Sequence, residues 1–160
     1  MKVTIRSAPL LILVTSLGIP CAVGYNIPED EAPYGASVAE VKTAEEDCDK
    51  NQMTLNICAW SSYRRSVEAL NKEVEMIEVA LKDNEIRLPI FTEAQDSWLL
   101  SRNADCDLDA SAVHGGSMVW SIAYSCREHL NKLRTVALGR FRGCLSGSCG
   151  QPVLFYERIR

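Results

Sequence analysis

Large apolar residues recur with helical spacing through the middle of the chain. Successive gaps of three and four residues separate them over three heptads, and charged residues occupy the remaining faces. This apolar stripe consists of Trp60, Tyr63, Val67, Leu70, Val74, Ile77 and Leu81. Because Thr54 stands at a suitable N-cap position, the pattern predicts a helix over residues 54–84.

A second helix is predicted over residues 89–104. The polar stretch 82–85 and Pro89 indicate a bend over 84–88, because proline disfavours helical geometry in the preceding residue and suits a first helical turn. The residues expected to face the first helix are Phe91, Ala94, Trp98 and Ser101.

A third helix is predicted over residues 118–141, after an Asp-rich loop over 105–117, with Ser117 as its N-cap. Its expected apolar face consists of Val119, Ile122, Cys126, Leu130, Leu133, Ala137 and Phe141. Three antiparallel helices indicate an all-α fold. We expect a small disulfide-stabilised antiparallel helical hairpin or three-helix bundle with irregular termini.

The first 24 residues have the layout of a secretory signal peptide. Lys2 and Arg6 form a basic start, and residues 8–19 form an apolar stretch too short to span a bilayer. Ala22 and Gly24 then suit a cleavage site, so the mature chain is expected to begin at Tyr25. Lipid modification of Cys21 is the alternative, but Gly18 and Pro20 do not suit that processing.

The mature chain divides into three segments by composition. Residues 25–47 are acidic, with Pro and Gly and few large apolar groups, and are expected to form a linker or loose arm. Residues 48–142 form the expected helical domain. Residues 143–160 are a tail in which Val153–Tyr156 is expected to form a short strand or to pack as an irregular arm.

Cleavage of the signal would reduce the seven cysteines to an even set of six, which indicates disulfides in an oxidising compartment. The expected disulfide residues are Cys48, Cys58, Cys106, Cys126, Cys144 and Cys149. Cys144 with Cys149 is the natural local pair and would close a six-residue ring. For the other four, antiparallel helices favour Cys58–Cys106 with Cys48–Cys126. The alternative is pairing of sequence neighbours, Cys48–Cys58 with Cys106–Cys126.

The residue types provide little for catalysis or for bound cofactors. The only histidines are His114 and His129, no serine lies in a G-x-S-x-G elbow, and no C-x-x-C pair suggests zinc. The Asp-rich stretch 105–111 resembles the first half of a calcium loop, but Ala110 stands where the sharp turn needs Gly. We expect a protein that is not an enzyme and holds neither cofactor nor metal.

Charge and loop composition favour a protein partner. The chain carries 17 basic and 21 acidic side chains, which argues against nucleic acid and for either cationic partners or a charge that only keeps the protein soluble. Two short loops are candidate contact surfaces, because preorganised loops lose little entropy on entering a cleft. The candidate binding residues are His114, Gly115, Gly116 and Ser117 in one loop and Ser146 and Ser148 in the other.

The middle of the chain resembles a known family. The residues that carry the resemblance are Asp47–Cys48, Gln52, Met53, Asn56–Ala59, Tyr63, Leu70–Asn71, Ala94–Gln95, Trp98, Arg102, Ala104–Cys106, Gly115–Ser117, Cys126 and Arg134–Thr135. They resemble the LprI-like lysozyme inhibitor domain, an exported helical module of bacteria, over about residues 48–138. Ser101 and Asn103 depart from the family pattern.

The resemblance implies a lysozyme inhibitor and a basic lysozyme as the partner. An acidic chain would be steered toward such a partner. Asn56, Asn71 and Gln95 are expected to support the helices by hydrogen bonds, and Trp98 to lie in the core. A structural or interaction module of the bacterial cell envelope, with a different protein partner, is the alternative hypothesis.

Overall fold

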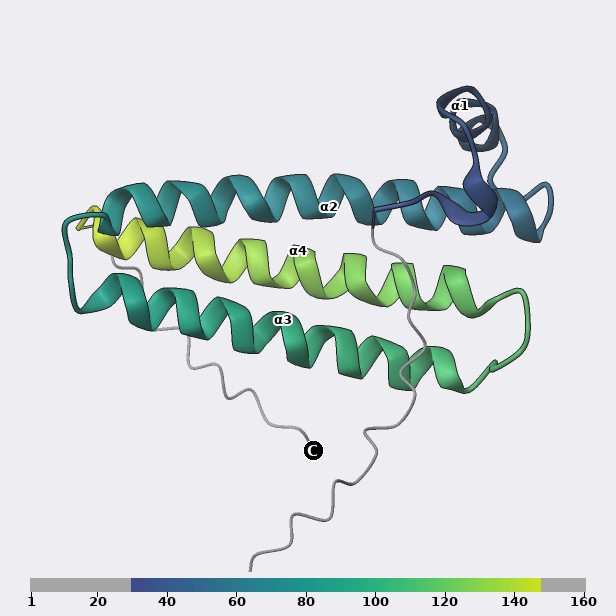
Figure 1. Cartoon of the computed structure of the whole chain (residues 1–160). Coiled ribbons are helices and arrows are strands. Elements are labelled where there is room, and N and C mark those ends of the chain that lie inside the picture. Colours follow the sequence, from purple (N-terminus) through teal and green to yellow (C-terminus); the bar gives the residue numbers. More distant parts are fainter. Residues whose placement is uncertain (1–29, 148–160) are drawn as a thin grey trace, which may run out of the picture.

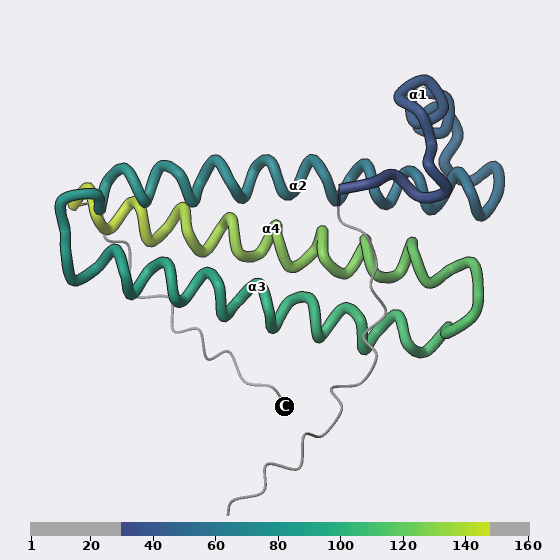
Figure 2. The backbone as a smooth tube through the Cα atoms, viewed as in Figure 1, coloured from purple at the N-terminus to yellow at the C-terminus, as the bar shows by residue number. Residues whose placement is uncertain are grey.

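The computed structural model describes residues 30–147, and these contain helices but no strand (Figure 1). The elements are η1 (Pro33–Gly35), α1 (Val38–Glu46), α2 (Gln52–Leu81), α3 (Arg87–Ser111) and α4 (Val119–Leu145). The three long helices α2, α3 and α4 pack as an antiparallel bundle, and α1 packs across the start of α2 (Figure 2). The predicted all-α, disulfide-stabilised bundle is confirmed; the irregular termini of that prediction lie outside the described residues.

The start of α2 is fixed by a reciprocal cap. The Asn51 side-chain oxygen accepts a hydrogen bond from the Thr54 backbone N–H at 3.0 Å, and the Thr54 hydroxyl accepts one from the Asn51 N–H at 3.1 Å. Asn51 is therefore the N-cap, and the prediction of Thr54 in that position was wrong. The helix ends at Leu81, three residues before the predicted end.

The predicted apolar stripe of α2 forms the core of the bundle. Tyr63, Leu70, Ile77 and Leu81 are buried, while Trp60, Val67 and Val74 are half-buried beside them. The Tyr63 ring stacks on Tyr124 of α4, with 5.7 Å between ring centroids. Because burial of each such side chain contributes about 1.5–3 kcal/mol, this stripe is a major source of the bundle's stability.

The inward faces of α3 and α4 are partly polar, contrary to the predicted apolar faces. Gln95 and Arg102 of α3 and Arg127 and Asn131 of α4 are buried. The residues predicted to face inward that are instead exposed are Ala94, Ser101, Leu133 and Phe141. The bundle therefore carries a buried polar layer that apolar periodicity does not reveal.

Asn131 is the centre of this polar layer. Its side-chain oxygen accepts a hydrogen bond from Arg102 Nη1 at 2.9 Å, and its side-chain nitrogen donates to Ser66 Oγ at 2.9 Å. The Arg102 guanidinium also lies over the rings of Tyr63 and Trp98, at 5.8 and 5.6 Å from their centroids. Hydrogen bonds and ring contacts thus offset the desolvation of the buried cation.

Two segments expected to lack regular structure are helical. Within the predicted acidic arm, residues 38–46 form α1, which is capped by Ser37 and Glu40. Within the predicted Asp-rich loop, α3 continues to Ser111, because Cys106 and Ala110 follow Arg102 at intervals of four residues and extend its buried face. The connection between α3 and α4 is correspondingly short.

The disulfides join sequence neighbours. Cys48 bonds Cys58, and Cys106 bonds Cys126. The favoured scheme of Cys58–Cys106 with Cys48–Cys126 was wrong. The segment between α1 and α2 folds back along the first turns of α2 and brings Cys48 to Cys58, while Cys106 of α3 faces Cys126 on the adjacent, antiparallel α4. Cys149 lies outside the described residues, so its predicted pairing with Cys144 stays a prediction.

Candidate functional site

Four of the six candidate binding residues lie in the turn between α3 and α4, residues 112–118. His114, Gly115, Gly116 and Ser117 are all exposed there. The Gly116 N–H donates to the Val113 carbonyl at 2.9 Å. Gly115 has φ +78°, a left-handed conformation that favours glycine. The turn is thus a tight, exposed structure with a defined backbone path.

A buried asparagine on α2 holds the base of this turn. Asn56 is fully buried, and its side-chain nitrogen donates hydrogen bonds to the Ser117 carbonyl at 2.9 Å and to the Tyr34 hydroxyl at 2.6 Å. Its side-chain oxygen accepts from Gln52 Nε2 at 2.9 Å. The expected support role of Asn56 is confirmed, whereas Asn71 is exposed on α2.

Ser117 contributes to this anchor through its backbone. The helix it precedes, α4, begins at Val119 with Met118 at the N-cap position and without a side-chain cap. The prediction of Ser117 as N-cap was therefore wrong. The Ser117 carbonyl accepts a hydrogen bond from Asn56, while the Ser117 side chain is at the surface, where a partner can reach it.

Two links between α3 and α4 stiffen the helices that carry the turn. One is the Cys106–Cys126 disulfide. The other is an ion pair between Arg127, which is almost fully buried, and Asp107, with 2.9 Å between Nη2 and Oδ1. Both helix ends are therefore fixed, and the turn is largely preorganised for binding.

The second candidate loop lies at the opposite end of the bundle. Ser146 follows the end of α4, and its hydroxyl donates to the Gly143 carbonyl at 2.8 Å; Ser148 lies outside the described residues. α4 has 27 residues, so at 1.5 Å per residue about 40 Å separates the two candidate loops. A single cleft in a partner cannot take both.

The two ends of the bundle also differ in charge. Around α1 and the start of α2, residues 30–50 hold seven acidic side chains against Lys42 and Lys50, and residues 105–109 at the end of α3 add three aspartates. At the opposite end, Arg134, Arg140 and Arg142 of α4 stand beside acidic residues of α2 and of the α2–α3 connection, among them Glu78, Asp83 and Glu85, so that end is closer to charge balance. The α3–α4 turn thus lies at the acidic end of the bundle.

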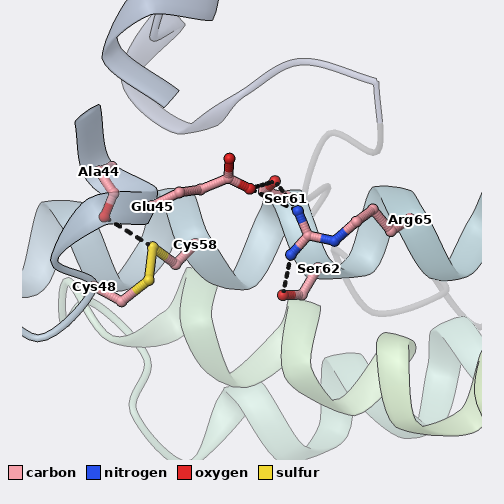
Figure 3. A network of polar contacts seen from close by, with 7 residues as sticks. All are labelled: Ala44, Glu45, Cys48, Cys58, Ser61, Ser62 and Arg65. Atoms are coloured by element: carbon pink, nitrogen blue, oxygen red, sulfur yellow. Dashed lines mark hydrogen bonds and ion pairs between the residues drawn. A yellow bond between two sulfur atoms is a disulfide. The ribbon is translucent and has the colours of Figure 1, made fainter. Parts of the chain in front are cut away.

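A polar network attaches α1 to α2 at this acidic end (Figure 3). Glu45 accepts a hydrogen bond from the Ser61 hydroxyl and forms an ion pair with Arg65, with 2.6 Å between Oε1 and Nη1. The Ser61 hydrogen bond first, and the Arg65 contacts second, hold the pKa of Glu45 below its usual value. Next to it, the Cys58 sulfur lies 3.2 Å from the Ala44 carbonyl.

Sequence reasoning missed α1 and its contacts because the arm is acidic and poor in large apolar residues. The motif Ser37-Val38-Ala39-Glu40 was the available signal. The Ser37 N–H donates to Glu40 Oε2 at 2.8 Å, and the Glu40 N–H donates back to the Ser37 hydroxyl, which completes a capping box. Tyr34, which reaches Asn56, has no comparable signature in the sequence.

The Asp-rich stretch does not form a calcium-type loop, because Asp105, Asp107 and Asp109 lie on α3, with Asp107 paired to Arg127. Among residues 30–147, no group of three or more His, Cys, Asp or Glu side chains is placed to hold a metal ion. None of the helices in that range is long and apolar enough to cross a membrane.

Two comparisons relate the chain to other proteins. A family described as "Lysozyme inhibitor LprI" matches residues 44–138. An uncharacterized protein of Rhizobium meliloti (strain 1021) is 32% identical over 113 residues, which cover 62% of this chain and 81% of that protein. No solved structure matches the chain. The family match includes the α3–α4 turn and ends before Ser146 and Ser148.

Proposed function

Because the chain belongs to the LprI lysozyme inhibitor family, we propose that it is an exported, non-enzymatic protein that binds and inhibits a basic lysozyme. The strongest structural support for this proposal is the position of the α3–α4 turn. The turn is exposed, tightly anchored, within the family match and at the acidic end of the bundle.

The α3–α4 turn is the proposed contact surface. Lysozymes act with two carboxyl groups that flank the scissile bond in a cleft. The Ser117 hydroxyl and the His114 imidazole are hydrogen-bond donors of the kind that pair with carboxylates, and both are exposed in the turn. A turn placed in the cleft would exclude the polysaccharide substrate.

The acidic end supplies the long-range part of the interaction. Exposed carboxylates on α1 and in the segment before α2, among them Glu46, Asp47 and Asp49, lie at the same end of the bundle as the turn (Figure 1). Such a charge steers a basic partner toward this end and raises the association rate, and added salt screens the effect. The opposite end, which is closer to charge balance, would attract the same partner less.

Export is proposed from the disulfides and the expected signal peptide, and not from the α3–α4 turn. Two disulfides, Cys48–Cys58 and Cys106–Cys126, suit a compartment that is oxidising, such as the periplasm or the exterior. The signal peptide expected over residues 1–24 agrees with this location. Expression with a C-terminal tag and mass determination of the exported protein would test cleavage before Tyr25.

The proposal is tested by the loss of turbidity of a peptidoglycan suspension with several lysozyme types, with and without residues 25–160. We expect protection at micromolar protein, stronger at low salt. His114→Ala with Ser117→Ala should weaken protection, and Ser146→Ala, at the opposite end, is the matched control. Absence of protection against every lysozyme tested would contradict inhibition and favour an interaction module of the cell envelope.

A further inference from the structure

A second surface of the bundle is an apolar groove between α3 and α4, near the end opposite the α3–α4 turn. Its volume is about 630 Å³. Its apolar lining includes Ile90, Phe91, Ala94, Ala137, Phe141 and Leu145, and the side chains of Arg87 and Arg134 also border it. Phe91 and Phe141 stack with 6.2 Å between ring centroids, so the groove has an aromatic wall.

Several of the groove's side chains remain open to solvent. Ile90 is 62% exposed and Phe141 is 39% exposed, and neighbouring Ile86 is 74% exposed. Burial of apolar surface is favourable by about 25 cal/mol per Å². A segment with apolar side chains at close spacing would therefore gain free energy by covering this groove.

The chain leaves α4 at the groove itself. Leu145, the last residue of the helix, and Cys144 both line it. Only six positions after Gly147, the last described residue, the sequence has the apolar segment Val153–Tyr156. Six residues reach about 20 Å when extended, which is sufficient to return over the groove.

The dimensions of segment and groove agree. Four extended residues span about 13 Å, and the part of α4 from Arg134 to Leu145 that lines the groove is about 17 Å long. The predicted Cys144–Cys149 disulfide would shorten the path further, because the tail would then resume beside a groove residue. We propose that Val153–Tyr156 of this chain docks into the groove between α3 and α4.

A covalently attached tail has an advantage over a separate partner. A short tether gives the segment an effective concentration in the millimolar range, so weak apolar contacts are sufficient for occupancy. Docking here leaves the α3–α4 turn uncovered, since the two surfaces lie at opposite ends of α4. The proposal is therefore independent of lysozyme inhibition.

The test compares residues 25–160 with a chain that stops at Gly150 and so keeps Cys149. We expect hydrogen exchange in residues 87–94 and 134–145 to be faster in the shorter chain, with no change around residues 112–118. A synthetic peptide of residues 151–160 should bind the shorter chain and restore the protection. Equal exchange in both chains, or a peptide that does not bind, would overturn the proposal.

Two variants identify the groove as the binding surface. Ile90→Glu places a charge in the groove at an exposed position and should weaken peptide binding by about tenfold or more, the equivalent of one lost apolar side chain. Leu100→Glu, on α3 outside the groove and 74% exposed, should leave the affinity unchanged. Equal effects of the two variants would contradict docking in the groove. A dimer seen by sedimentation for residues 25–160, but not for the chain that stops at Gly150, would contradict docking within one chain.

Discussion

The side-chain nitrogen of Asn56 lies 2.9 Å from the backbone carbonyl oxygen of Ser117 and donates a hydrogen bond to it. The contact joins residues 61 positions apart and crosses from the start of α2 to the turn before α4. Since the amide of Asn56 is fully buried, the turn has one defined position relative to the bundle.

Asn56→Ala is expected to lower the free energy of unfolding by about 1–3 kcal/mol, because it leaves the Ser117 carbonyl without its buried donor. The Gln52 amide loses one acceptor and keeps the Ser121 hydroxyl. Urea unfolding followed by circular dichroism measures the change. Asn71→Ala, at an exposed position of the same helix, is the control and should change stability by less than about 0.5 kcal/mol. Equal losses in the two variants would contradict the anchoring role.

Two glycines of the chain are expected to respond oppositely to alanine. Gly115 has φ +78°, so Gly115→Ala should destabilise the protein by about 1 kcal/mol even though its Cβ would meet open space. Gly139 is inside α4, and a Cβ there would meet its nearest atom, Glu73 Oε1, at 3.7 Å. Gly139→Ala should therefore stabilise the protein by about 0.5–1 kcal/mol through helix propensity.

Thermal unfolding of both glycine variants gives the comparison directly. If Gly115→Ala also weakens lysozyme inhibition while Gly139→Ala does not, the turn's backbone conformation matters to binding as well as to stability. A Gly115→Ala variant as stable as the parent would contradict the left-handed conformation at that position.

The helical fold was predictable where apolar residues define the buried face. The stripe of α2 alternates at three and four residues, and its members are buried or half-buried in the bundle. The inward face of α4 was not predictable in this way, because it includes Arg127 and Asn131. Those side chains are buried because partners on other helices satisfy them, and such partners become evident only after the helices are packed.

The sequence allowed the candidate binding residues to be named, but not their positions in the bundle to be predicted. The glycines and Ser117 indicated a turn before the last helix, and the structure has a turn there. That the turn and Ser146 lie at opposite ends depends on the length of α4, which extends four residues beyond its predicted end. The acidic end likewise depends on α1, which the sequence analysis assigned to a loose arm.

The disulfides are expected to stabilise different parts of the chain. They join residues 10 and 20 positions apart, so chain entropy gives about 3 kcal/mol for each. Replacement of Cys106 and Cys126 by Ala should lower the stability of the whole bundle, because they join two of its three long helices. Replacement of Cys48 and Cys58 should mainly release α1, which hydrogen exchange of residues 38–46 would detect.

Peptide mapping without reduction tests the pairing itself. A peptide that links Cys48 to Cys58, and another that links Cys106 to Cys126, are the expected products. A linked peptide joining Cys58 to Cys106 would contradict the arrangement of α1 against α2 described above.

Glu45 is expected to make the attachment of α1 depend on pH. Its pKa is lowered in the folded protein by the Ser61 hydroxyl first and by Arg65 second, from an ordinary value of 4.5. The folded state then binds fewer protons than the unfolded state as the pH falls through this range. The contribution of Glu45 to stability is therefore fully present above about pH 4.5 and is lost as the pH falls through the lower, folded-state pKa.

Glu45→Gln should accordingly reduce stability at pH 7 and lose its effect at the lowest pH, measured by urea unfolding between pH 3 and 7. The difference should stay below about 1 kcal/mol, because the Glu45 side chain is about one-third exposed and solvent screens its ion pair. Arg65→Gln should reproduce part of the effect, since it removes the second cause and retains the Ser61 hydrogen bond. A Glu45→Gln effect that grows as the pH falls would show that the charge of Glu45 destabilises the fold, which is the reverse of the sign derived from its contacts.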